Sequence, residues 1–213
     1  MITKLVRTSH NGSTESNTPN HFLERIHADL SGPYEIRREK KYFMAIRDEF
    51  SGYIHVEFIV SKTRTSIFRV LDNFPKLMRS RVPQYKVRCI HTDNGTESHN
   101  KLWDNYLQER MVSRDEVVSY SPQSNGFAES TNHQLKLRAK CLLLPTDTIN
   151  DSIVHYFTII YAAYLLNRTV NICKGKTPFE LLFHRMPTLK NLNRFGADAI
   201  VKLPQESISQ IKK

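Results

Sequence analysis

Short runs of β-branched and aromatic residues recur along the first third of the chain and are separated by turn-forming residues. Three such runs cover 25–30, 42–47 and 53–60, with Pro33 and Ser51-Gly52 between them. Runs of this length and composition, bounded by proline or glycine, are typical of β-strands joined by turns. We therefore predict three strands in an antiparallel meander.

The spacing of apolar residues becomes helical after the third run. Residues 63–78 place apolar side chains three and four positions apart, which predicts an amphipathic helix that is kinked or interrupted at Pro75. A strand at 87–92, a helix at 101–111 and a strand at 117–120 follow. Strands that alternate with helices pair in parallel through crossovers. The predicted fold class is therefore α/β, with a mixed five-stranded sheet flanked by helices.

Two further helices are predicted after the last strand. The first covers 125–143 and carries a polar stripe opposite an apolar stripe, so the apolar stripe is expected to pack against the sheet. The second covers 150–167 and is almost unbroken in apolar and aromatic residues. A helix of this kind packs inward or against a partner.

The chain is long enough for one sizeable core with an appendage, at 213 residues and 39% hydrophobic content. Its net charge of +10 is uneven, because twelve lysines and arginines face five acids from Ser130 onward, against nineteen and sixteen before it. A clustered basic surface is the electrostatic footprint of a nucleic-acid partner. A solvated surface that keeps the protein soluble explains the same charge, and the two interpretations stay open at this point.

The cysteines and the N-terminus exclude several classes of protein. Cys89, Cys141 and Cys173 are isolated, so neither a zinc knuckle nor a disulfide framework is supported, and a reducing compartment is expected. No apolar signal region and no run of membrane-spanning length is present, so we expect no membrane partner. Residues 8–20 are polar and read as a flexible leader.

Three acids carry the candidate chemistry. Asp29 and Asp93 each follow a short apolar run, and Glu129 lies on the polar stripe of the 125–143 helix, with thirty-five residues between Asp93 and Glu129. Taken alone, an aspartate is more often a turn residue or a helix cap. Together, three carboxylates on separate elements are able to converge on a hard divalent cation such as Mg²⁺.

The order, spacing and flanking residues of these acids resemble the Asp, Asp, Glu triad of retroviral-type integrases, and in particular the copia-type LTR-retrotransposon branch. The resemblance covers residues 27–202 and extends to further blocks of sequence. The chain departs from the family at two positions. It has one glycine, Gly95, after the Asp-Asn pair, where the family often has two. It has Ser130 after Glu129, where the family commonly has arginine. Asp48 and Glu49 match a strand end of the family and are interpreted as structural. The further blocks are 41–51, 121–126, 176–181 and 187–196.

The resemblance implies a ribonuclease-H-like fold in which Asp29, Asp93 and Glu129 are the catalytic and metal-binding residues. It implies Mg²⁺ or Mn²⁺ as cofactor, with two ions. A mobile loop before the glutamate would lie over the metals, and basic residues after it would bind DNA. The DNA-contact candidates are Lys136, His133, Lys140, Gln123 and Asn125.

The function expected from the resemblance is DNA integration, in which a metal-dependent polynucleotidyl transferase joins retrotransposon DNA 3′ ends to target DNA. The alternative is a truncated, catalytically silent remnant, such as a yeast-like element copy, that keeps nucleic-acid binding. We expect a leader at 1–21 after a missing zinc domain, a catalytic core at 22–170 and a post-core extension at 171–213. DNA and further copies of the chain are the expected partners, acting in the nucleus and, within virus-like particles, in the cytoplasm.

Overall fold

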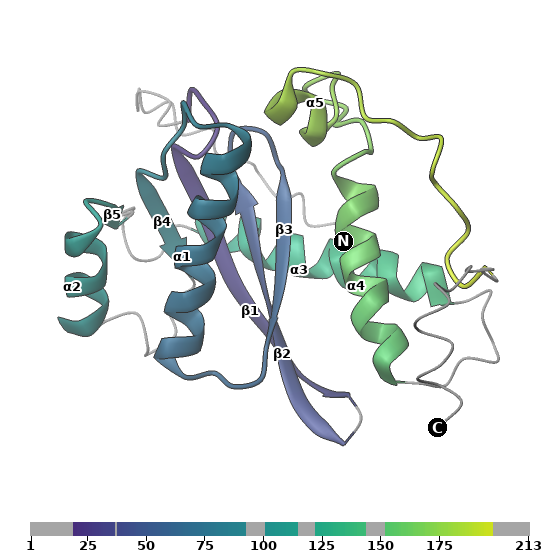
Figure 1. The fold of residues 1–213 in the computed structure, drawn as a ribbon, viewed down its shortest axis with the longest axis horizontal. Coiled ribbons are helices and arrows are strands. Elements are labelled where there is room, and N and C mark those ends of the chain that lie inside the picture. Colours follow the sequence, from purple (N-terminus) through teal and green to yellow (C-terminus); the bar gives the residue numbers. More distant parts are fainter. Residues whose placement is uncertain (1–18, 37, 93–100, 115–121, 144–151, 198–213) are drawn as a thin grey trace, which may run out of the picture.

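The computed structural model describes residues 19–36, 38–92, 101–114, 122–143 and 152–197. Within these residues, one five-stranded sheet has the order β3-β2-β1-β4-β5 (Figure 1). The first three strands are antiparallel neighbours, and β4 and β5 continue the sheet in parallel with β1. The predicted mixed five-stranded sheet is therefore confirmed. The strands are β1 Arg25–Ile36, β2 Glu39–Asp48, β3 Ile54–Ile59, β4 Cys89–Thr92 and β5 Ser113–Arg114.

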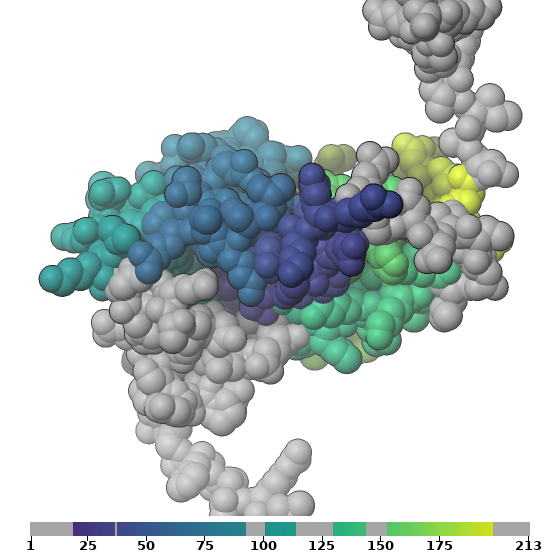
Figure 2. All heavy atoms as spheres, turned by 90° about the horizontal axis from the view of Figure 1, so that it is seen from below, coloured from purple at the N-terminus to yellow at the C-terminus, as the bar shows by residue number. Residues whose placement is uncertain are grey.

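Helices cover both faces of the sheet. Helix α1 lies on one face, while α3 crosses the opposite face with α4 packed against it (Figure 1). Seen from below, the purple and indigo strand residues lie between the blue residues of α1 and the green residues of α3 (Figure 2). Among the described residues, no helix is long and apolar enough to cross a membrane. The helices are α1 Arg64–Arg81, α2 Lys101–Glu109, α3 Pro122–Leu143, α4 Ser152–Leu166 and α5 Pro178–Phe183.

The alternation of side chains along β1 decides which residues face which helix layer. Ile26 and Ala28 are buried in the core shared with α1 and α2. Since successive strand residues point to opposite faces, His27 and Asp29 face the layer of α3 and α4. The core on that second face joins Phe43 of β2 to the two helices. Polar groups thus occupy the α3 side of β1, where the candidate chemistry is expected.

Strand β1 is longer than predicted and continues past Pro33 to Ile36. Its register with β2 shifts between Ser31 and Tyr34, and Gly32 lies within this irregularity at φ 126°. A Cβ at Gly32 would lie 3.0 Å from the carbonyl oxygen of Lys41, so glycine is required here. Asp29 therefore lies inside the strand rather than at its end, which corrects the sequence prediction.

Three other elements differ from the predictions made from sequence. Helix α1 runs through Pro75 without interruption. Helix α3 begins at Pro122, where proline is favoured in a first helical turn, so Gln123 and Asn125 are helical and not part of a loop. The strand predicted at 117–120 lies outside the described residues, as do residues 1–18 of the leader predicted at 1–21. The fifth strand that is described is β5.

Helix α5 was not predicted, although its start signal is present in the sequence. The hydroxyl oxygen of Thr177 accepts a hydrogen bond from the Glu180 backbone nitrogen at 3.0 Å, and Glu180 Oε2 accepts one from the Thr177 nitrogen at 2.8 Å. This reciprocal pair is a capping box. It begins α5 at Pro178 and sets the helix beside the end of α4.

His55 of β3 is expected to make stability depend on pH. Burial, with a smaller contribution from the charge of Arg81, lowers the pKa of His55 to about 4. The nearest carboxylate oxygen of Glu57 lies 3.9 Å from His55 Nε2, too far to reverse this shift. The unfolded chain takes up this proton near pH 6.5 and the folded chain only near pH 4, so the contribution is complete above pH 6.5. It is lost as pH falls toward 4, by up to about 3 kcal/mol.

The comparison of the wild type with His55→Phe isolates this contribution, because phenylalanine keeps the ring against Phe74, whose centroid lies 5.4 Å away. Urea unfolding at a series of pH values should show the wild type losing more stability than His55→Phe between pH 6.5 and 4. Parallel losses in the two proteins would contradict the assignment.

Candidate active site

Asp29 lies at the centre of the candidate site. Its side chain is half-buried, and across the sheet it faces Ala45 of β2. On its other side β1 pairs in parallel with β4, where Ala28 lies opposite Thr92, the last residue of that strand. Asp29 is thus the residue of β1 that follows its described pairing with β4.

Asn132 of α3 holds the Asp29 carboxylate. Its side-chain amide nitrogen donates a hydrogen bond to Asp29 Oδ2 at 2.5 Å, and Asn132 is only 7% exposed. A hydrogen bond to a carboxylate is stronger than one between neutral groups, so it fixes the orientation of the acid. The carbonyl oxygen of Asn132 is buried and has no hydrogen-bond partner among the described residues. Sequence reasoning placed Asn132 on the polar stripe but missed this contact.

A second polar contact docks α3 on the sheet beside this pair. Arg47 of β2 donates from Nη1 to the hydroxyl of Thr131 at 3.2 Å. Burial lowers the pKa of Arg47, which is consistent with a guanidinium enclosed between the helix and the sheet. Thr131 and Asn132 therefore bind neighbouring strands with adjacent side chains, and the helix face that meets Asp29 is held in one orientation.

A buried ionic network continues the polar face of β1. His27 is 5% exposed, and its Nε2 lies 2.7 Å from Glu49 Oε2, while Arg25 Nη1 lies 3.3 Å from both oxygens of that carboxylate. Burial alone would raise the pKa of Glu49, but the hydrogen bond from His27 and the charges of His27 and Arg25 outweigh it and lower the pKa. The His91 ring of β4 packs against the His27 ring, with the two ring centroids 4.9 Å apart. This network gives Glu49 a structural role, as interpreted from sequence.

The structure describes less of the other two acids of the predicted triad. Asp93 follows Thr92 in the sequence but lies outside the described residues. Glu129 is in the described backbone of α3, three residues before Asn132, while its side chain lies outside the described part. The same is true of the side chains of Gln123 and Asn125. Among the described side chains, no group of three or more His, Cys, Asp or Glu residues is placed to hold a metal ion.

The basic candidates on α3 share one cavity. His133, Lys136 and Lys140 are exposed and line a hollow of about 320 Å³ between α3, α4 and the β1–β2 hairpin. Its remaining wall is largely aromatic and aliphatic, and includes Phe58 of β3 and Tyr156 of α4, whose ring centroids lie 4.1 Å apart with the rings tilted by 40°. Positive charge thus collects on the exposed side of the helix whose buried side holds Asp29.

The donors around Asp29 fit a hard divalent cation. Asp29 offers carboxylate oxygens, the ligand type that Mg²⁺ and Mn²⁺ prefer, and Asn132 holds one of them through its amide nitrogen.

Comparison with known proteins agrees with this architecture. The chain matches no protein-family model. The Retrovirus-related Pol polyprotein from transposon TNT 1-94 of Nicotiana tabacum is 24% identical over 205 residues, which is 93% of this chain and 15% of that polyprotein. The chain thus spans a small part of the length of this relative.

Two solved structures share the arrangement of elements. The simian T-cell lymphotropic virus intasome matches with a TM-score of 0.60 and 18% identity, over 87% of this chain and 61% of that chain. The HTLV-2 integrase catalytic core domain, solved in complex with magnesium in a trimeric form, matches with a TM-score of 0.56 and 20% identity, over 78% and 97%. The chain has the fold of a retroviral integrase catalytic core. The ribonuclease-H-like fold and the resemblance to the retroviral integrase superfamily are thereby confirmed.

Proposed function

We propose that this integrase-like core is a metal-dependent polynucleotidyl transferase that joins the 3′ ends of retrotransposon DNA to target DNA. The observation that carries the proposal is the Asp29–Asn132 contact, which joins the strand acid to α3. The contact lies in a fold shared with integrase catalytic cores. Asp29, Asp93 and Glu129 are the proposed catalytic and metal-binding residues.

Chain connectivity supports the convergence of these three acids. Ala28 and Thr92 are register partners, and Asp29 and Asp93 are the residues that follow them in the sequence. Residues three apart on a helix lie on neighbouring positions of one face, so Glu129 begins one turn before Asn132 on the face that meets Asp29. The strand register and the helix spacing are backbone features, and neither depends on the side chains of Asp93 or Glu129.

Bound Mg²⁺ or Mn²⁺, proposed as two ions, would neutralise the acids and lower the pKa of an attacking water or 3′ hydroxyl. The residues of the chain do the positioning. Asn132 holds one oxygen of Asp29 in place, and the Arg47–Thr131 bond keeps the helix at a fixed distance from the strand. Such support of a ligand is worth about 10- to 100-fold in metal affinity or activity.

A strand-transfer assay tests the proposal most directly. The purified chain is incubated with a labelled duplex that carries an element end, with target DNA, and with Mg²⁺, Mn²⁺ or a chelator. Labelled DNA joined to the target, or the reverse reaction on a branched substrate, is expected with either metal and not with the chelator. DNA binding without any joining, cleavage or reversal would instead favour the catalytically silent remnant.

The basic side of α3 is expected to bind DNA through its phosphates. Lys136→Glu should weaken binding to a duplex about 10-fold or more at low salt, since it replaces attraction by repulsion beside the cavity. Wild-type affinity should fall steeply as salt rises, because neutralised phosphates release counterions. Fluorescence anisotropy over a salt series measures both effects.

Arg138→Glu is the matched control, because Arg138 is exposed on the same helix but does not line the cavity. It changes net charge by the same amount as Lys136→Glu. Equal losses of affinity in the two variants would mean that overall charge and not this face of α3 binds DNA. His133, Lys140, Gln123 and Asn125 are proposed as further contacts on the same helix.

A second copy of the chain is the proposed protein partner. Helix α4 buries Ile159, Ala162 and Ala163 against the sheet, yet leaves Phe157 52% and Ile160 38% exposed. Exposed apolar residues of this size on one helix suit a contact with another protomer. The proposed site of action is the nucleus, reached from virus-like particles in the cytoplasm.

A further inference from the structure

Three arginines line a second pocket, which lies at the β3 edge of the sheet. Arg81 ends α1, Arg168 follows α4 and Arg185 follows α5, so residues far apart in the sequence meet here. The pocket has a volume of about 510 Å³, and aromatic rings form much of its wall. We call it the arginine pocket. Its aromatic residues are Tyr53, Tyr164, Phe179 and Phe183.

The guanidinium of Arg168 is positioned by its surroundings. It lies 3.4 Å from the Tyr164 ring centroid and 5.0 Å from that of Phe179, and its Nη1 donates to the Tyr164 carbonyl oxygen at 3.1 Å. Its Nε is buried and has no hydrogen-bond partner among the described residues. The guanidinium of Arg185 also lies over the Phe179 ring, 5.4 Å from its centroid. Stacking of this kind orients a guanidinium while leaving its edge donors for a ligand.

Within the described part of the chain, no acidic side chain neutralises these three arginines. None of Arg81, Arg168 and Arg185 forms an ion pair with a described carboxylate, and the pocket wall contains no acid. By contrast, Arg25 and Arg110 pair with Glu49 and Asp72. Three like charges around one concave surface favour an anion that carries more than one negative charge.

Tyr53 lies in the same pocket wall as Arg81 and Arg168. Burial raises the pKa of its hydroxyl, and the positive charges of Arg81 and Arg168 act in the opposite direction. Arg81 approaches from α1 and Arg168 from α4, on opposite faces of the sheet.

We infer that the arginine pocket binds a nucleotide, with its phosphate between the guanidiniums and its sugar and base against the aromatic wall. Arginine binds phosphate through paired donors, and base-sized rings stack on aromatic side chains and guanidiniums. The volume of about 510 Å³ exceeds what a bare phosphate needs and suits a nucleotide. An acidic peptide would use the charges but not the ring wall, so a nucleotide is favoured.

The arginine pocket is separate from the proposed catalytic site. The arginine pocket shares no residue with the α3 cavity or with the contacts of Asp29. Its Ile54 lies on the outermost strand, β3, two strands away from β1. Binding here is therefore testable without divalent metal and without strand transfer.

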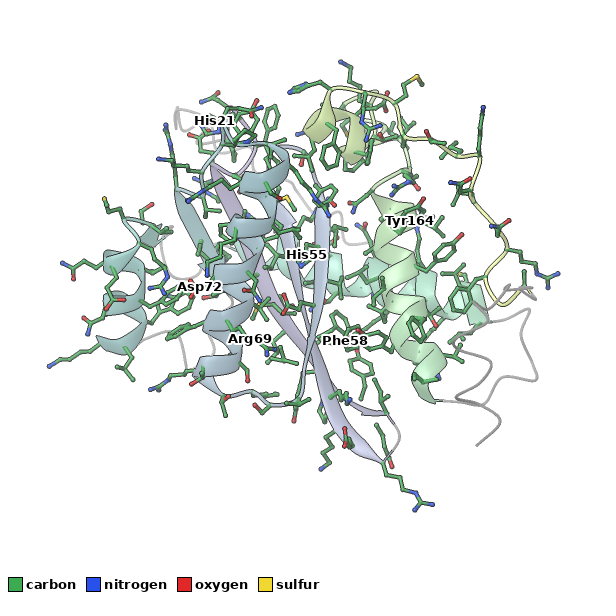
Figure 3. All side chains as sticks on the ribbon, viewed as in Figure 1. His21, His55, Phe58, Arg69, Asp72 and Tyr164 are labelled. Carbon is green, nitrogen blue, oxygen red and sulfur yellow. The ribbon has the colours of Figure 1, made fainter. Side chains whose placement is uncertain are left out.

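Binding is measured by calorimetry and anisotropy in the presence of a chelator. The probes are thymidine 5′-monophosphate, thymidine, a short single-stranded oligothymidylate and a poly-glutamate peptide. Arg81→Gln and Arg185→Gln are the test variants, since both side chains are exposed and their replacement does not threaten the core. Arg69→Gln is the matched control, because Arg69 is exposed near the other end of α1, far from Tyr164 (Figure 3).

Each test variant is expected to weaken binding of the oligothymidylate roughly 10-fold, as expected for loss of a hydrogen bond to a charged group, while Arg69→Gln changes it less than about twofold. The same dependence with the monophosphate would identify a free nucleotide as a sufficient ligand, and dependence with the oligothymidylate alone would identify a nucleic-acid strand. Both results support the inference. Equal loss in Arg69→Gln, binding of thymidine as tight as that of the phosphate-bearing probes, or tighter arginine-dependent binding of poly-glutamate would overturn it.

Discussion

Asp29→Asn is expected to lower metal-dependent strand transfer by at least about 100-fold while leaving the fold intact. Asparagine keeps the shape of the side chain, so the 2.5 Å contact with Asn132 is replaced by one between neutral groups and the strand is unchanged. The loss of charge removes a carboxylate ligand, which should cost more than the 10- to 100-fold typical of a supporting residue. Product formation with Mg²⁺ and with Mn²⁺ measures the effect.

Two further variants separate the role of Asp29 from a general effect of charge. Glu35→Gln removes an exposed acid from the same strand and should leave activity unchanged. Asn132→Ala keeps the acid but removes its hydrogen bond, so its loss should fall between the other two. If Asp29→Asn retained wild-type rates, or if Glu35→Gln lost as much, Asp29 would not be a catalytic residue.

Local periodicity was sufficient to predict most of the architecture. The alternation of Ile26 and Ala28 with His27 and Asp29 is visible in the sequence, and it determines which side chains face α1 and which face α3. The helical spacing of α1 identified Val70 and Phe74 as inward residues, and both are buried. These features depend only on neighbours a few residues apart, which is why the sequence alone specifies them.

Contacts between distant residues were not predictable in the same way. Asn132 and Asp29 are 103 positions apart, and their hydrogen bond depends on how α3 crosses the sheet. The arginine pocket likewise needs Arg81, Arg168 and Arg185 to meet from three helices. Strand β1 was predicted too short because proline usually ends a strand, whereas the irregularity at Gly32 lets the pairing continue. In each case the deciding interaction is tertiary.

Asp48 is expected to be the most important polar residue for stability among those that the structure describes. Its side chain is 0% exposed, and its carboxylate accepts hydrogen bonds from the Leu23 nitrogen at 2.8 Å and from the Ser51 nitrogen and hydroxyl, both at 2.7 Å. The acid therefore ties the segment before β1 to the turn after β2. Burial raises the pKa of Asp48 to about 6, although these donors act to lower it.

Asp48→Ala should lower the free energy of unfolding by about 3–5 kcal/mol, because it leaves the Leu23 and Ser51 nitrogens buried without an acceptor, at about 1–3 kcal/mol for each group. Asp48→Asn keeps one acceptor for Leu23 and should lose roughly half as much.

Since the folded pKa exceeds the unfolded value of 3.8, this carboxyl contributes most stability below pH 4 and loses it as pH rises to 6, a dependence that Asp48→Asn should remove. Glu39→Ala, on the same strand and 69% exposed at its side chain, is the control and should change stability by less than about 0.5 kcal/mol. Urea unfolding at pH 4, where the carboxyl contributes most, decides the matter, and an Asp48→Ala effect no larger than that of Glu39→Ala would show that the three hydrogen bonds do not hold the turn to the start of β1.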